Sequence, residues 1–130
     1  MRRELHIGPE AIDETALLSG RVVRPEMGAV VCFMGFVRGT EAGAAVAGLA
    51  YESFQEMAAH QFHLLFDHLE AQWPVSSVRL VHRTGVVNTG EPSLWVELIA
   101  PHRAEAFAAC QWLVDEMKRV VPIWKKPLSA

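Results

Sequence analysis

The three lysines of this chain, Lys118, Lys125 and Lys126, all fall within nine residues near its C-terminus, and arginine supplies the other permanent side-chain cations. Arginine is almost always protonated, whereas burial can lower the pKa of a lysine amine until it takes part in proton transfer or nucleophilic attack. Four cations follow Glu116 with no acid after them, so this segment attracts anions although the whole chain has a net charge of -3. We therefore expect the chemistry of the protein to take place here.

Lys118 falls near the end of a helix that the sequence predicts from Arg103 to Val120. The buried face of this helix is predicted to consist of Ala106, Cys110, Leu113 and Met117. Lys118 lies at the rim of that face, where two interpretations stay open. Its amine either extends into water, or it is partly desolvated and serves as an acid, a base or a nucleophile.

Lys125 is predicted to come close to Lys118 because Pro122 ends the helix between them. The segment after the proline can then fold back over the helix end, with Trp124 as its anchor. The two amines would face the same space.

Two arginines and a histidine are candidate anion ligands. His102 and Arg103 begin the predicted helix, whose first turn offers unpaired N–H groups and a partial positive charge to a phosphate or carboxylate. Arg38 follows an apolar run and has the planar shape that grips a phosphate through two hydrogen bonds. In each case the alternative is a solvated charge at the end of an element.

The elements that must position these groups alternate between strands and helices. Strands are predicted at 3–7, 28–37, 45–54, 77–87 and 93–100, and helices at 9–18, 55–73 and 103–120. The run 28–37 is apolar on both alternating faces, so we expect a strand covered on both sides, with a bulge or a close approach at Gly35. The turn at 88–91 predicts a hairpin between the last two strands, and hairpins favour a mainly antiparallel sheet. We predict one α+β domain over residues 1–130.

Composition excludes several classes of protein. The mild negative charge argues against a nucleic-acid binder. No apolar run reaches the roughly 18–20 residues that span a bilayer, and no apolar signal core follows the first residues, so we expect no membrane partner and a cytoplasmic location.

Metal and disulfide chemistry are not expected either. His60, His63 and His68 lack the spacing of a zinc site and no ligand set completes them, so we expect no metal and no bound cofactor. Cys32 and Cys110 are predicted to be buried free thiols, with a catalytic thiol as the alternative and no disulfide.

Six segments form an ordered pattern over about residues 27–126. The segments are Gly28-Ala29 through Phe33-x-Gly35-x-Val37-Arg38; Leu49-x-Tyr51-Glu52 with Met57-Ala58; His82-Arg83-x-Gly85; Gly90-Glu91; His102-Arg103-x-x-Ala106-Phe107; and Lys118-x-x-x-Pro122-Ile123-Trp124-Lys125-Lys126. In order and approximate spacing they resemble the large, catalytic subunit of molybdopterin synthase. The joint pattern carries the resemblance, above all the last segment.

The resemblance implies an α/β-hammerhead fold, a homodimer of large subunits and a heterotetramer with two small ubiquitin-like sulfur-carrier subunits. The Gly-Gly C-terminus of each carrier, as a thiocarboxylate, would enter the site and give its sulfur to cyclic pyranopterin monophosphate. Two transfers would build the dithiolene of molybdopterin.

The same resemblance implies the residues of the site. Lys118 and Lys125 would be catalytic, and the substrate would be bound by Phe36, Val37, Arg38, His102, Arg103, Lys118, Lys125, Lys126 and Pro127. Pro127 stands where the family commonly has an acid, and this departure motivates an alternative, a non-catalytic paralogue that binds the carrier or a pterin. A third interpretation is an unrelated domain that binds small anions.

Overall fold

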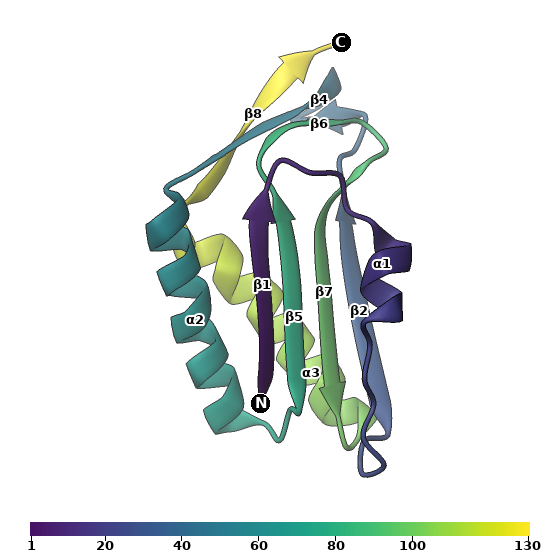
Figure 1. Cartoon of the computed structure of the whole chain (residues 1–130). Coiled ribbons are helices and arrows are strands. Elements are labelled where there is room, and N and C mark those ends of the chain that lie inside the picture. Colours follow the sequence, from purple (N-terminus) through teal and green to yellow (C-terminus); the bar gives the residue numbers. More distant parts are fainter.

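The computed structural model describes residues 1–130 and contains two four-stranded assemblies of β-strands with three helices around them (Figure 1). The larger sheet has the strand order β1-β5-β7-β2. Its strands are β1 (Arg2–Gly8), β5 (Ser77–Arg83), β7 (Pro92–Ala100) and β2 (Ala29–Phe36). β1 and β5 are parallel and the other two pairs are antiparallel, which confirms the predicted α+β class with a mainly antiparallel sheet.

The smaller sheet lies across one end of the larger one (Figure 1) and is organised around β4 (Ala44–Ser53). β4 pairs antiparallel with β3 (Thr40–Glu41), β6 (Gly85–Asn88) and β8 (Ile123–Ser129). The prediction of one continuous strand over 77–87 is wrong, whereas the turn at 88–91 and the antiparallel pairing of β5 with β7 are confirmed. Gly85 has φ +72°, a conformation that glycine adopts without strain, and the chain turns there so that β6 pairs with β4 instead of β7.

Two helices cover one face of the larger sheet and enclose the main core. α3 (Arg103–Val120) packs against β2 and β7, and α2 (Gln55–Gln72) packs against α3 and β1. Both ranges agree closely with the predicted helices, because their apolar residues recur at helical spacing. The largest side chains of this core are Phe62, Phe66, Leu69, Leu80, Leu98 and Leu113, all at most 1 % exposed.

The short helix α1 (Glu14–Ser19) begins later than predicted. The sequence suggested a start at Pro9, but the carboxylate of Asp13 accepts a hydrogen bond from the N–H of Ala16 at 3.1 Å and caps the helix there. An N-cap of this kind satisfies one of the free N–H groups of the first turn, so it fixes the start of the helix.

A buried ion-pair network ties the segment after α1 to the other face of the sheet. Glu97 is fully buried, and its carboxylate accepts hydrogen bonds from Arg79 at 2.8 and 2.9 Å and from Arg21 at 2.7 Å. Burial raises the pKa of Glu97, but the hydrogen bonds from Arg79 and Arg21 outweigh that effect and hold it below its usual value.

β2 differs from its prediction in burial. It is an edge strand, and side chains such as Val30 and Phe33 are exposed along it, so the expected cover on both sides is absent in a single chain. Cys32 is exposed and not buried as predicted, whereas Cys110 is buried as predicted. The pairing register of β2 shifts between Gly35 and Phe36, which confirms the irregularity predicted at Gly35. No helix is both long and apolar enough to cross a membrane.

Candidate functional site

A cavity of about 500 Å³ lies where the end of α3, the end of β2 and the smaller sheet meet. Its lining divides into two parts. Exposed residues form the rim, which includes Arg38, Lys118 and Lys125. Less exposed residues form the floor, which includes Tyr51, His82 and Ser93. We call the first three residues the cation rim and the second three the neutral floor.

The cation rim gathers side chains from three separate parts of the chain. Lys118 comes from the last turn of α3, Lys125 from β8, and Arg38 from the segment after β2. The segment after Pro122 does fold back, as predicted, because β8 pairs with β4 and sets Lys125 opposite Tyr51. The two lysines therefore line the same cavity although they belong to different elements.

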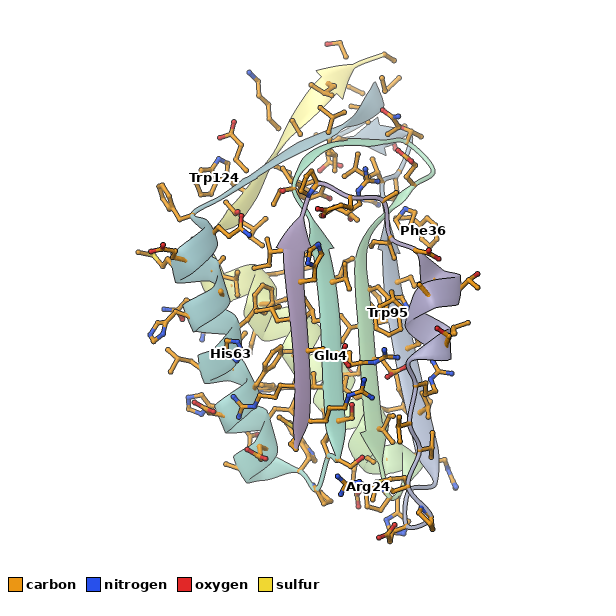
Figure 2. All side chains as sticks on the ribbon, in the orientation of Figure 1. Glu4, Arg24, Phe36, His63, Trp95 and Trp124 are labelled. Atoms are coloured by element: carbon orange, nitrogen blue, oxygen red, sulfur yellow. The ribbon has the colours of Figure 1, made fainter.

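Trp124 holds β8 at the mouth of the cavity, which agrees with its predicted role as an anchor. Its ring packs edge-on against Phe54 with the centroids 5.1 Å apart. Its indole N–H donates to the carboxylate of Glu52 at 3.2 Å. Both Trp124 and Phe36 also line the cavity, and Figure 2 shows both toward the end of the molecule that carries the smaller sheet.

The lysine amines are accessible to water in the single chain. Lys118 is exposed, which agrees with the interpretation in which its amine extends from the rim of the apolar face. Lys125 lies 3.0 Å from the carboxylate of Glu41, and the hydrogen bond from this lysine lowers the pKa of Glu41 below its usual value. Sequence reasoning did not predict Glu41 as part of the site. Only the pairing of β3 with β4 places it there, and no local pattern signals that pairing.

The neutral floor is a chain of uncharged polar groups. The Tyr51 hydroxyl donates to Ser93 Oγ at 3.2 Å, and Ser93 Oγ donates to the carbonyl of Gly35 at 3.4 Å. The Tyr51 ring meets the His82 ring edge-on at 5.3 Å. Burial lowers the pKa of His82, an effect that its hydrogen bond to the Arg83 carbonyl opposes only in part. His82 therefore stays a neutral imidazole at neutral pH.

Several predicted site residues lie outside this lining. Val37 is buried in a small cluster with Leu49 and Val87. Lys126 and Pro127 are exposed on β8 but do not line the cavity, whereas Phe36 lines its rim.

His102 and Arg103 lie at the opposite end of α3. Arg103 and Lys118 are separated by 15 helical residues, which corresponds to about 22 Å along the helix axis. His102 is close to Glu105 at 3.2 Å, and Arg103 is exposed without an ion pair. One chain therefore does not bring this pair to the lysines.

No group of three or more histidine, cysteine, aspartate or glutamate side chains is arranged to hold a metal ion. The cavity suits anionic ligands, since three cations and only one carboxylate line it.

Comparison with known proteins gives a consistent result. Residues 7–120 match the model of the MoaE protein family. A molybdopterin synthase catalytic subunit from Thermoplasma volcanium is 38% identical over 111 residues, which are 85% of this chain and 81% of that protein. The crystal structure of molybdopterin synthase from Staphylococcus aureus has a TM-score of 0.87 at 29% identity and covers 96% of this chain and 90% of its own.

A third match concerns the fold alone. The complex of subunits 1 and 2 of molybdopterin-converting factor from Helicobacter pylori has a TM-score of 0.74 at 21% identity, with 98% of this chain and 89% of that chain covered.

Proposed function

This chain belongs to the MoaE protein family, and from this premise we propose that its cavity is the place where sulfur is transferred in the synthesis of molybdopterin. Relatives that share most of its length are catalytic subunits of molybdopterin synthase, so the chain is a sulfur-transferring enzyme of molybdenum cofactor biosynthesis. The observation that supports the position of the site is the convergence of Arg38, Lys118 and Lys125 on one cavity.

The cavity suits the two proposed ligands by size and charge. About 500 Å³ lies in the range of pockets for small molecules, which fits cyclic pyranopterin monophosphate. Its phosphate is a ligand for Arg38, through the paired N–H groups of the guanidinium. The thiocarboxylate of the carrier is a second anion, and Lys118 and Lys125 attract and orient it.

We propose that the carrier tail enters past the exposed rings of Phe36 and Trp124 at the cavity mouth. A Gly-Gly end has no side chains, so it can pass between such rings in an extended form. In each transfer the thiocarboxylate sulfur forms a bond to a substrate carbon, and the bond from that carbon to a substrate oxygen breaks, so that this oxygen leaves. Water then cleaves the acyl carbon–sulfur bond, which releases the carrier as a carboxylate. A protonated lysine supplies the proton to the leaving oxygen or stabilises the anionic intermediate.

We further propose that β2 is the interface of a homodimer. The outer edge of β2 has no strand partner, and exposed apolar side chains stand beside it, among them Val30, Phe33 and Phe107. An unpaired apolar edge of this kind is a template for another strand. A second copy of the chain would cover it, and a two-fold axis makes the two copies of β2 antiparallel. With one carrier on each large subunit, the assembly is a heterotetramer.

This dimer would also bring His102 and Arg103 to a cavity. They lie beside the first residue of β2, because Ala29 pairs with Ala100 just before the start of α3. The cavity lies at the other end of β2, at Phe36. Antiparallel pairing sets the first end of one β2 opposite the last end of its partner. The His-Arg pair of each copy then serves the phosphate site of the other.

The direct test mixes the purified protein with thiocarboxylated carrier and cyclic pyranopterin monophosphate and measures dithiolene product. Formation of product above the background without protein supports the enzyme. Tight binding of the carrier without product would instead support the non-catalytic paralogue that Pro127 motivates. Absence of carrier binding would exclude both in favour of a simple anion-binding domain.

A further inference from the structure

His82 has an unused hydrogen-bond acceptor inside the cavity. Its Nδ1 lies 2.7 Å from the carbonyl oxygen of Arg83. A carbonyl oxygen only accepts, so Nδ1 must carry the proton and Nε2 must hold the lone pair. No protein group hydrogen-bonds to Nε2, and this atom is not among the completely buried unpaired atoms. Because His82 is only 7 % exposed and lines the cavity, the accessible part of its ring faces that space.

The surroundings of His82 hold its ring in place. Tyr51 from β4 packs against it edge-on, and its register partner on β7 is the buried Leu94. The charged groups that line the same cavity are the cation rim and Glu41, of which Glu41 is already paired with Lys125. An acceptor that is rigid, neutral and partly desolvated is suited to an uncharged N–H donor and not to an anion.

We propose that His82 Nε2 accepts a hydrogen bond from a ring N–H of the pterin and so selects the uncharged, heteroaromatic part of the substrate. This inference rests on the proposed function and adds a specificity-determining residue to it. The cation rim binds the anionic ends of the ligands. The neutral floor binds the flat ring of the pterin. The apolar side chains of Leu49 and Leu94 also line the cavity, and they suit a planar ring better than an extended peptide.

Two substitutions of His82 distinguish the role of Nδ1 from the role of Nε2. His82→Asn keeps a donor near the position of Nδ1, where it can still bond to the Arg83 carbonyl, but it has nothing at the position of Nε2. His82→Gln carries an acceptor to the position of Nε2. His60→Asn makes the first change at an exposed histidine on α2 and serves as the matched control.

Binding of cyclic pyranopterin monophosphate, measured by calorimetry on the full-length protein, should be about 3- to 10-fold weaker in His82→Asn, the contribution of one hydrogen bond. His82→Gln should bind within about twofold of wild type, because its amide oxygen replaces the lost acceptor. Binding of the carrier should be unchanged in both variants. His60→Asn should match wild type for both ligands.

Wild-type affinity of His82→Asn for the pterin would overturn the proposal. Equal losses in both variants, or a parallel loss of carrier binding, would assign His82 a structural role and overturn it as well. If wild type itself neither binds nor converts the pyranopterin, the proposed function fails together with this inference. A wild-type enzyme that is active beside an equally active His82→Asn variant would refute the inference alone.

Nitrogen NMR of the wild-type protein tests the same claim without any substitution. With 15N-labelled histidine, His82 should give the signals of the neutral Nδ1–H tautomer at pH 7, and addition of the pyranopterin should shift its Nε2 signal. An imidazolium, an Nε2–H tautomer or an unmoved Nε2 signal would overturn the proposal, even if His82→Asn failed to fold.

Discussion

A site shared between two copies of the chain predicts a specific pattern of complementation. Arg103 and Lys118 of one chain are about 22 Å apart along α3, too far to act on one small substrate. β2 spans a similar distance, about 23 Å from Ala29 to Phe36. The length of β2 is therefore nearly the distance that separates Arg103 from Lys118 within one chain. Antiparallel pairing of β2 with its copy would bring Arg103 of one chain to the end of β2 where Lys118 of the other chain lies.

The test combines two impaired variants, Lys118→Ala and Arg103→Ala, in one dimer. Alone, Lys118→Ala should lower turnover about 100-fold, the usual contribution of a proton-transfer group. Arg103→Ala should weaken substrate binding about 10-fold or more through the lost charged hydrogen bond to phosphate. In a dimer with one variant of each kind, one cavity has both defects and the other has none. Such a dimer should show about half of wild-type turnover.

The assay uses two affinity tags, so that only mixed dimers are purified, and measures dithiolene product at subsaturating pyranopterin. The matched control places both substitutions in one chain and pairs it with a wild-type chain. In a shared site this arrangement leaves neither cavity intact, and its turnover should fall well below half. The opposite result, recovery in the control and none in the mixed dimer, would place each site within one chain. A monomer in solution would refute the reasoning at once.

Three further predictions concern single substitutions. Lys118→Ala should lose most turnover without loss of thermal stability. Arg119→Ala, on the exposed side of the same turn, should keep normal turnover and normal thermal stability. A normal rate in Lys118→Ala would remove Lys118 from the mechanism. Glu41→Gln should tighten carrier binding about two- to fivefold, because it frees the lysine that Glu41 now pairs with, and unchanged or weaker binding in calorimetry would contradict this. Glu97→Gln should lower the free energy of unfolding by about 3–5 kcal/mol, since it leaves its arginine partners uncompensated, whereas exposed Glu56→Gln should change it little. The pKa of Glu97 is lowered in the folded state, so its contribution to the free energy of unfolding is complete above the ordinary pKa of 4.5 and is lost as the pH falls below that value. In denaturant titrations, the free energy of unfolding should therefore fall less steeply with acid in Glu97→Gln than in wild type.

The sequence predicted best those features that depend on neighbours along the chain. α2 and α3 are recognisable because their apolar residues recur at helical spacing, and Pro122 marks the end of the second. The fold-back of Lys125 follows from the same proline. Gly85 could not be read in this way, because a glycine within an apolar run is compatible with a bulge, a turn or a continuous strand.

The features that it missed depend on partners far away in the chain. An apolar run such as β2 is typical of a central strand, yet the order of the sheet leaves it at an edge, and periodicity cannot distinguish the two positions. Glu41 reaches the cavity only through the pairing of two residues with β4. For Arg103, in contrast, the predicted length of α3 already implied its distance from Lys118, and a second copy of the chain is what closes that distance in our proposal.

The position of charge in the cavity follows from the cost of burial. The larger sheet ends at the floor, where a permanent charge would lose its hydration, and the groups found there are a hydroxyl pair and a histidine that stays neutral. The three cations stand instead on the end of a helix, on an edge strand and on a loop, where water solvates them until an anion arrives. Their amines and guanidinium therefore cost the folded chain little while the cavity is empty. Their attraction for a phosphate or a thiocarboxylate then increases as the ligands displace that water. The electrostatic interaction is therefore strongest in the complex that holds both ligands, where the sulfur is transferred.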